Sequence, residues 1–288
     1  MDDAAKNRVC VNQLDFIQAF IQSEAKRGMF VILDKEYGHF CPKLASHFGR
    51  PLKLNKCLYE ADFSGKSWYE TLDSYLINTL HFVRSRVDGC MYLLREGDNW
   101  LKSINYVDDA LSYSNNEDLR LKFEKSLKKR FNLSLLGQAK WYLSMKIKQS
   151  NNYINLDQEQ YIKNIIRRFK KSSKHQFKIK STPLSNNFVP TKRSSLVTDT
   201  QTKEVKLRFG NLHYRSVICE LLYVSCCTTS DTAFAVNKLA KFSNNPGITH
   251  YWAVLHLIGY IKNTAHKQLN FSQITRNTRS LRPLWITT

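Results

Sequence analysis

The spacing of apolar residues along the chain predicts helices in two places within its first half. From Gly65 onward, large apolar residues recur at steps of three and four, which is the period that places them on one helical face. A second run, with steps of four, follows Asn116, whose side chain is suited to an N-cap. The apolar positions of the two runs are Trp68, Leu72, Tyr75, Leu76 and Leu80, then Leu119, Phe123, Leu127 and Phe131.

Shorter apolar stretches with turn residues between them predict strands. Residues 89–114 read as three antiparallel strands, which reverse first at Glu96–Asn99 and again at Val107–Ala110. Residues 9–22 predict a short strand followed by a helical turn, and residues 139–157 predict a hairpin that turns at Asn151 and Asn152. The first half of the chain therefore combines helices with an antiparallel sheet.

The second half of the chain is mostly helical in pattern. One helix follows Asp157, and three more are predicted at Tyr214–Cys226, Thr232–Phe242 and Tyr251–Ile261. Residues 170–208 are rich in Ser, Thr, Asn and Lys without periodicity, which predicts a basic linker. Residues 271–288 form an unpatterned tail. An α+β domain over residues 1–150, followed by a helical domain over 151–270, is the predicted organisation.

Charge and cysteine content narrow the class of protein. The 288 residues include 44 Lys and Arg against 24 Asp and Glu, a net charge of +20, which favours a polyanionic partner, nucleic acid first, over a merely solubilising surface. Seven cysteines without a C-x-x-C pair argue against a disulfide framework or a zinc ribbon. The first residues are charged and hold no apolar segment, so we expect no secretory signal there, and no apolar run is long enough to span a membrane.

Two adjacent carboxylates, Asp108 and Asp109, stand between two predicted strands. On spacing alone, an ordinary Asp-rich turn is the favoured explanation, because Asp is a common turn residue. Asp15, on its own strand-like segment, is the candidate for a third carboxylate if the strands are neighbours. Mg²⁺ is held by one or two carboxylates plus substrate phosphates, and two such ions about 3.5–4 Å apart clamp an in-line phosphoryl displacement. The sequence leaves both interpretations open.

Positive charge is concentrated between Lys140 and Lys180. This segment holds 11 Lys and Arg against 2 acidic residues, so its net charge is 11 − 2 = +9. Basic side chains that contact phosphates give affinity without sequence preference, as an enzyme that moves along any template requires. A solvated helix face is the alternative explanation.

Seven boxes, in order, resemble those of reverse transcriptases of copia-type long-terminal-repeat retrotransposons. The sequence YVDD at residues 106–109 resembles the aromatic-x-Asp-Asp box of reverse transcriptases in general. The resemblance to the copia-type family covers about residues 11–271, and besides YVDD the seven boxes are QLDFIQAFIQ, SWYETLDSYL, LGQAKWYLSMKI, LDQEQYIKNIIRRF, STPL, YRSVICELLYVSCCTTSDTAFAVNKLAKF and NPGITHYWAVLHLIGYIKNT.

The resemblance implies an RNA-directed DNA polymerase with a palm built on an antiparallel sheet and a helical thumb. It implies two-metal transfer of a nucleotide from a dNTP to a primer 3′-hydroxyl with Mg²⁺ or Mn²⁺, on an RNA or DNA template. It also implies residence in a cytoplasmic retrotransposon particle, or in the nucleus, without membrane attachment or secretion. It does not imply an oligomeric state.

The family's site residues carry over to matching positions. Asp15 and Asp108 match the metal-binding carboxylates, and Asp109 matches the second Asp of the box. Phe20 matches the aromatic residue under the incoming sugar, where a ring excludes a 2′-hydroxyl, and Tyr106 would pack near the primer end. Without the resemblance to the family, the sequence pattern alone favours Phe20 as an ordinary core residue. The residues expected to contact nucleic acid are Trp141, Lys146, Lys148, Lys163, Arg167, Arg168, Lys170 and Lys171.

Three substitutions depart from the family's pattern. Glu60 and Ser144 stand where the family has glycine, and Phe63 replaces a glutamine that helps to hold the nucleotide. The fingers are expected to be largely missing, and a ribonuclease H domain is not recognised. These departures keep a second hypothesis open, a catalytically dead nucleic-acid-binding remnant of such an element. A basic scaffold protein is a third, which the ordered boxes disfavour.

Overall fold

The chain folds into two compact units. A computed structural model describes residues 1–172, 178–186, 188, 191, 195, 198–210 and 212–272. Within these residues, unit 1 runs from Met1 to Ala139 and unit 2 from Lys140 to Ser272. Residue 150, where the sequence analysis divides the domains, lies in unit 2, in the turn of a hairpin.

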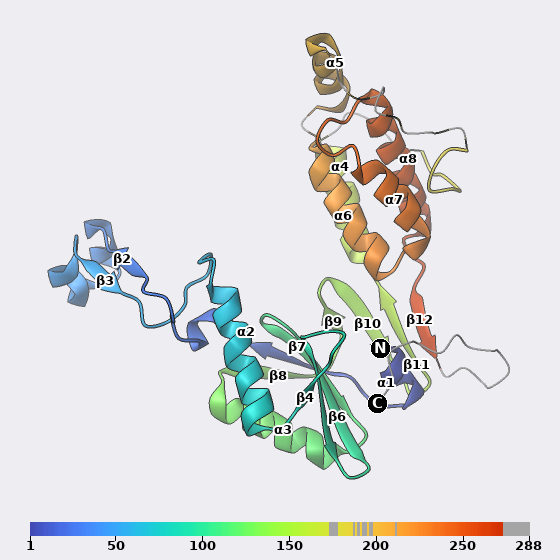
Figure 1. The fold of residues 1–288 in the computed structure, drawn as a ribbon. Helices are drawn as coiled ribbons and strands as arrows, with labels where there is room; N and C mark the ends of the chain where they lie inside the picture. Colours follow the sequence, from blue (N-terminus) through green and yellow to red (C-terminus); the bar gives the residue numbers. More distant parts are fainter. Residues whose placement is uncertain are drawn as a thin grey trace. The chain divides into compact units, whose positions relative to one another are not determined.

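Unit 1 is built on a six-stranded antiparallel sheet with the strand order β4-β5-β6-β7-β1-β8. This mixture of antiparallel sheet and helices confirms the predicted α+β class (Figure 1). The strands are β1 (Asn12–Phe16), β4 (Val83–Arg84), β5 (Met91–Glu96), β6 (Asn99–Tyr106), β7 (Asp109–Ser114) and β8 (Leu133–Gln138).

The other elements of unit 1 precede, follow or link these strands. Residues 27–51, which the sequence leaves unassigned, contribute to a separate two-stranded sheet with short helices beside it. The elements are α1 (Asp2–Lys6), η1 (Ala19–Gln22), β2 (Phe30–Ile32), η2 (Lys35–His39), η3 (Pro42–His47), β3 (Pro51–Lys53), α2 (Ser64–Ser74), the π-helix η4 (Tyr75–Thr79) and α3 (Glu117–Arg130).

Helices α2 and α3 and the sheet share one hydrophobic core. Trp68, Leu72 and Leu76 are buried in it, as the period of their segment predicts. Leu119, Phe123, Leu127 and Phe131 are buried there as well, together with the strand residues Leu14, Phe16, Leu101 and Ala110. Apolar burial of this kind is the main favourable term in folding, so the two predicted helical faces are confirmed and fix the helices over the sheet.

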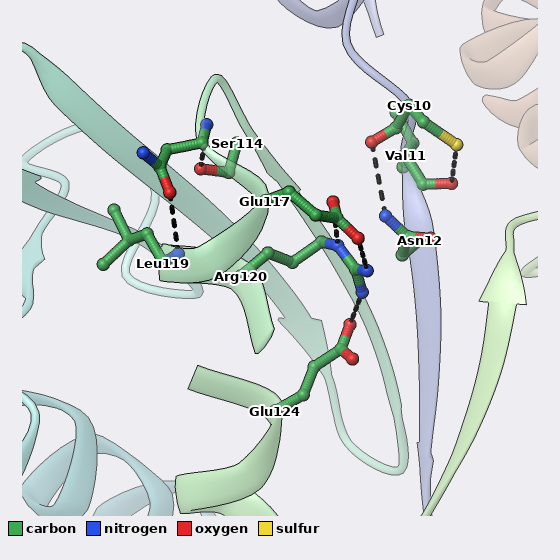
Figure 2. Close-up of polar contacts among 9 residues, drawn as sticks. Cys10, Val11, Asn12, Ser114, Glu117, Leu119, Arg120 and Glu124 are labelled. Carbon is green, nitrogen blue, oxygen red and sulfur yellow. Dashed lines mark hydrogen bonds and ion pairs between the residues drawn. The ribbon is translucent and has the colours of Figure 1, made fainter. Parts of the chain in front are cut away.

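The start of α3 is held by side-chain hydrogen bonds (Figure 2). The Asn116 side chain accepts from the Leu119 backbone N–H at 2.9 Å, which confirms the predicted N-cap. Arg120 forms ion pairs with Glu117 and with Glu124, whose side chain is buried. Because a buried carboxylate is costly unless it is paired, Arg120 allows Glu124 to lie against the core.

Unit 2 combines a four-stranded antiparallel sheet, in the order β12-β11-β10-β9, with five α-helices and the 3₁₀-helix η6 among its described residues. Its core lies between the helices, around α8. The elements are β9 (Trp141–Tyr142), β10 (Met145–Gln149), β11 (Tyr153–Asp157), α4 (Glu159–Ser172), α5 (Asp199–Phe209), α6 (Tyr214–Cys227), η6 (Ser230–Thr232), α7 (Ala233–Ala240), α8 (Ile248–Thr264) and β12 (Leu269–Ser272). None of the helices in the described part of the chain is long and apolar enough to cross a membrane.

The prediction of a linker over residues 170–208 is wrong at both of its ends. Helix α4 continues to Ser172, and residues 199–209 form α5. Thr198 and Gln201 form a reciprocal capping box at the start of α5. Val205 and Phe209 bury their side chains in the core of unit 2, so packing stabilises a helix whose polar composition suggests a loop.

The segment from Lys178 to Leu184 lies across α8 at Gly259. The Lys180 backbone N–H donates to the Gly259 carbonyl at 3.4 Å, and the Asn263 side chain donates to the Lys180 carbonyl at 3.3 Å. His256 Nε2 lies 3.0 Å from the Thr182 carbonyl oxygen. A Cβ atom at position 259 would lie 2.2 Å from the Lys178 carbonyl oxygen, so only glycine permits this approach.

Gly259→Ala should therefore destabilise unit 2 in spite of alanine's better helix propensity. The helix gains about 1 kcal/mol from alanine, whereas overpacking against a backbone oxygen costs about 1–3 kcal/mol. We expect the free energy of unfolding to fall by up to about 2 kcal/mol in urea denaturation. The matched control is Gly65→Ala in α2, where a Cβ meets nothing within 4 Å and the variant should gain stability. Equal gains in the two variants would refute the close approach.

Candidate active site

Strands β1 and β7 bring the predicted carboxylates to one end of the sheet of unit 1. Asp15 and Asp109 are direct partners in the antiparallel register of the two strands. The Phe16 backbone N–H donates to the Asp108 carbonyl at 2.7 Å, which extends the pairing to the turn. Residues directly opposite in an antiparallel pair have side chains on the same face. Asp15 is thus a neighbour of the Asp108–Asp109 pair although more than ninety positions separate them in the sequence.

The turn between β6 and β7 has an unfavourable backbone conformation. Val107 has φ = +54°, a left-handed value that is rare for a β-branched residue. The Trp68 indole N–H donates to the Val107 carbonyl at 2.7 Å, and the Trp68 ring is itself fixed by edge-on contacts with Phe16 and Phe131. The core of unit 1 thereby holds the strained turn that carries Asp108 and Asp109.

Burial and like charge raise the pKa values of both turn aspartates. For Asp108, burial is the larger cause, the negative charge of Asp15 adds to it, and a hydrogen bond from Tyr59 opposes both. For Asp109, burial again comes first, a hydrogen bond from Gln13 lowers the pKa, and Asp15 and Asp108 raise it. Within the described residues, no Lys or Arg forms an ion pair with any of the three aspartates.

The three aspartates carry the oxygen ligands that a divalent cation prefers, but by themselves they do not form a complete metal-binding site. Among the residues that the structure describes, no group of three or more His, Cys, Asp or Glu is arranged to hold a metal ion. Mg²⁺ sites that act on phosphates use one or two carboxylates and take their other ligands from substrate and water. Oxygen donors on adjacent strands, with mutual repulsion and no cationic partner in the described part, are suited to such a site.

Tyr59 connects Phe20, the residue expected under the incoming sugar, to the aspartates. The Phe20 ring packs against the core and against Tyr59, with ring centroids 4.7 Å apart. The Tyr59 hydroxyl donates to Asp108 Oδ2 at 3.5 Å. Tyr106 is 58% exposed at the end of β6. The structure thus brings Phe20 and Asp108 to a common neighbour, Tyr59.

Sequence reasoning missed two residues of this site. The Gln13 side chain donates to Asp109 Oδ1 at 3.4 Å. Its position two residues before Asp15 on the same strand places it on the same face, and this signal could have identified it. Tyr59 lies in a segment without periodicity, so nothing in the pattern of the chain indicates its contact with Asp108.

The residues of the β9–β10 hairpin that are expected to contact nucleic acid lie in unit 2. Lys146 Nζ lies 6.0 Å from the centre of the Trp141 ring, a cation–π contact at an exposed position. Leu143 and Ser144 form the turn, and both have positive φ angles. The Tyr223 hydroxyl on α6 donates to the Leu143 carbonyl. Lys148 is exposed on β10.

Several basic side chains of α4 that are expected to contact nucleic acid already form ion pairs or hydrogen bonds within unit 2. Lys163 pairs with Glu159 at 2.7 Å, and Arg168 pairs with Glu220 at 2.8 Å. Arg167 donates to Asn164 at 3.2 Å. Lys170 is exposed, and the side chain of Lys171 lies outside what the structure describes. The positive charge of this face is therefore reduced by its own acidic neighbours.

At two positions where the family has glycine and this chain does not, the backbone has a left-handed conformation. Glu60 has φ = +69° and Ser144 has φ = +63°. The left-handed region costs a non-glycine residue about 1–2 kcal/mol. Glycine is thus the residue best suited to the backbone at both positions, although this chain has glutamate and serine there.

Glu60→Gly should stabilise unit 1. Glycine relieves the strain of about 1–2 kcal/mol but adds flexibility to the unfolded chain, so we expect a net gain of about 0.5–1 kcal/mol. The neighbouring variant Ala61→Gly, at a position without positive φ, should lose stability. Chemical denaturation of both variants checks this, and a loss of stability in Glu60→Gly would contradict it.

Comparison with known proteins agrees with the geometry. Residues 3–184 match the family model "Reverse transcriptase (RNA-dependent DNA polymerase)". The chain is 30% identical over 264 residues to "Retrovirus-related Pol polyprotein from transposon TNT 1-94" of Nicotiana tabacum, which covers 91% of this chain and 19% of the relative. Over 259 residues it is 25% identical to the corresponding polyprotein from transposon RE1 of Arabidopsis thaliana, with 88% and 16% covered.

A third relative, from transposon RE2 of Arabidopsis thaliana, is 24% identical over 257 residues, with 88% of this chain and 16% of the relative covered. The chain thus spans a fifth or less of the length of these relatives. The family match extends over more than half of the chain and includes Asp15, Asp108 and Asp109. The chain belongs to the reverse transcriptase family, in its copia-type branch.

Proposed function

We propose that this chain is an RNA-directed DNA polymerase that transfers nucleotides from dNTPs to a primer 3′-hydroxyl. In this proposal unit 1 is the palm and unit 2 is the thumb. The observation that carries it is the register of β1 and β7, which makes Asp15 the strand partner of Asp109. Membership of the reverse transcriptase family supports the same activity.

Asp15, Asp108 and Asp109 are proposed to hold Mg²⁺, or Mn²⁺, together with the triphosphate. A bound divalent ion supplies Lewis-acid stabilisation of the charge that develops on the phosphoryl oxygens. The protein's own contribution is to fix three carboxylates next to one another on a rigid sheet. Burial first and the neighbouring negative charges second raise the pKa values of Asp108 and Asp109, and both effects make a cation favourable at this place.

In the reaction, the primer 3′-oxygen forms a bond to the α-phosphorus of the dNTP, and the bond from that phosphorus to the bridging oxygen breaks. The hydroxyl proton passes to solvent water, and pyrophosphate leaves. Phe20, held against Tyr59, is proposed to contact the sugar of the incoming nucleotide. A ring at this position leaves no room for a 2′-hydroxyl and favours deoxynucleotides.

Basic and aromatic residues of unit 2 are proposed to hold the template–primer backbone. Trp141, Lys146 and Lys148 of the hairpin are partly or fully exposed, as are Arg167 and Lys170 of α4. Contacts of this kind give affinity that falls steeply with salt and does not depend on base sequence. Lys163 and Arg168 contribute less because each has an acidic partner.

Primer extension on poly(rA)/oligo(dT) with dTTP tests the proposal. We expect incorporation that requires Mg²⁺ or Mn²⁺ and is lost in EDTA. Salt-sensitive binding of the template–primer without any incorporation, in either metal, would overturn the polymerase proposal. That result would instead support the nucleic-acid-binding remnant, so a binding measurement accompanies each extension assay.

A further inference from the structure

The ring proposed to contact the sugar of the incoming nucleotide is carried by a short turn. Phe20 lies in the four-residue 3₁₀-helix η1, and the Ser23 hydroxyl donates to its carbonyl at 2.8 Å. The Gln22 side chain forms two hydrogen bonds with the backbone of Asn132, which fixes the same turn. The Phe20 side chain is only partly buried against the core of unit 1. The backbone of η1 is therefore well fixed, whereas the core holds only part of the ring.

Tyr59 provides a second contact to the Phe20 ring. The two ring centroids are 4.7 Å apart and the ring planes are tilted by 49°, within the range in which aromatic pairs attract each other. The hydroxyl of the same side chain donates to Asp108 Oδ2 at 3.5 Å. Tyr59 is 45% exposed, so it is not a core residue. It connects the ring expected to contact the sugar to a carboxylate expected to hold the metal.

The backbone that carries Tyr59 is tied to the segment that follows η1. The Cys57 backbone N–H donates to the Ser23 carbonyl at 3.2 Å, and the buried Cys57 side chain lies beside the same segment. Directly after Tyr59, Glu60 has a left-handed φ of +69°. Strained backbone persists only where the surrounding structure fixes it, and it is concentrated at functional sites. The fold therefore determines where the exposed Tyr59 ring lies.

These contacts give Tyr59 a role in the choice between deoxynucleotides and ribonucleotides. A ring excludes a 2′-hydroxyl only if it cannot move aside, and a side chain meets this condition when its neighbours fix its rotamer. We propose that Tyr59 is a positioning residue that holds the Phe20 ring in place relative to Asp108 and thereby sets how strictly the site selects deoxynucleotides. This inference rests on the proposed function, because it requires that unit 1 binds a nucleotide.

Binding of dUTP and UTP to the full chain measures this selection without turnover. The two nucleotides differ only in the 2′-hydroxyl, and both pair with a poly(rA) template. A dideoxy-terminated oligo(dT) primer prevents incorporation, so the dissociation constant of each nucleotide is measured in the complex with template, primer and Mg²⁺. The wild type should bind dUTP more tightly than UTP, and the ratio of the two constants is the sugar preference.

Three variants separate the Tyr59 ring from its hydroxyl and from a general effect of losing a tyrosine. Tyr59→Ala removes the ring, so the sugar preference should fall by about threefold to tenfold, the contribution of one aromatic pair. Tyr59→Phe retains the ring and should retain most of the preference. Tyr37→Ala, at an exposed position in η2, is the matched control and should leave the preference unchanged. Circular dichroism establishes that each variant is folded.

A double-mutant cycle shows whether Tyr59 acts through Phe20. Phe20→Ala should itself reduce the sugar preference, and Tyr59→Ala added to it should reduce the preference no further. In urea denaturation, which needs no nucleotide, the costs of the two substitutions should be non-additive because the rings are in contact.

The possible failures are distinguishable. A wild type that binds neither nucleotide would overturn the proposed function and the selective role of Tyr59 with it. A wild type that prefers dUTP, with the same preference in Tyr59→Ala, would overturn the inference about Tyr59 alone. So would a Tyr59→Ala variant that binds both nucleotides equally less tightly, because Tyr59 would then contact the nucleotide without positioning Phe20.

Discussion

Asp108→Asn should abolish primer extension and, at neutral pH, raise the melting temperature of the protein. Loss of a ligand for a catalytic cation removes several kcal/mol of transition-state stabilisation, which corresponds to a fall in rate of about a thousandfold or more. The gain in stability has a different origin, because asparagine removes a charge that burial disfavours and that Asp15 also repels.

The sign of the stability effect follows from proton linkage. The pKa of Asp108 is raised in the folded state, so the folded protein binds this proton more tightly than the unfolded chain does. The associated stabilisation is present below the unfolded pKa and is lost as the pH rises through the folded value. At pH 7 the wild type has lost it, and asparagine, which stays neutral, should show its largest advantage there.

Melting curves of Asp108→Asn and of the wild type between pH 4 and pH 8, with extension assays at pH 8, check both expectations. Asp118→Asn is the matched control, since Asp118 is exposed in the first turn of α3 and has no place in the site. It should extend primers at the wild-type rate. An Asp108→Asn variant that extends normally, or that melts below the wild type at neutral pH, would contradict the account of this residue.

Trp68→Ala should be the most destabilising substitution in unit 1. The side chain is 2% exposed and contacts Phe16 and Phe131 with ring centroids 5.1 Å and 5.5 Å away. Removal of a buried Trp leaves a cavity and costs about 3–5 kcal/mol. It also removes the hydrogen bond to Val107, so extension should fall further than the loss of folded protein explains.

Trp68→Phe separates the two effects. It retains most of the packing but removes the donor to the Val107 carbonyl, so the free energy of unfolding should fall by only about 1–2 kcal/mol while extension is still impaired. Trp141→Ala, at a position that is 45% exposed in unit 2, should leave stability almost unchanged. Urea denaturation supplies the values. A cost below about 1 kcal/mol for Trp68→Ala would show that the core does not hold the turn as described.

Local sequence patterns were enough to predict those elements whose structure is determined by residues close together in the chain. The Asn116 cap, the buried face of α3 and the reversal after Tyr106 depend on residues within a few positions of one another, and all three were predicted correctly. Helix α5 was missed because its stability comes from Val205 and Phe209 packing into a core built by distant segments. Its polar composition alone does not favour a helix.

The site itself could be predicted only in part. The Asp108–Asp109 pair is visible as a motif, but the pairing of Asp15 with Asp109 joins two distant strands, and their register follows from the whole sheet. Nor does the sequence indicate that Tyr59 donates to Asp108 or that Val107 is strained. Such contacts arise from tertiary packing, which no short window of residues contains.

Titration of Mn²⁺ in the presence of template, a dideoxy-terminated primer and dNTP tests the central claim most directly. Paramagnetic resonance of free Mn²⁺ reports the bound fraction without requiring turnover. If Asp15 shares the site with Asp108 and Asp109, Asp15→Asn should weaken Mn²⁺ binding by about tenfold or more, and Asp118→Asn should not. Equal affinity and stoichiometry in Asp15→Asn and the wild type would contradict the claim that the strand partner of Asp109 helps to hold the metal.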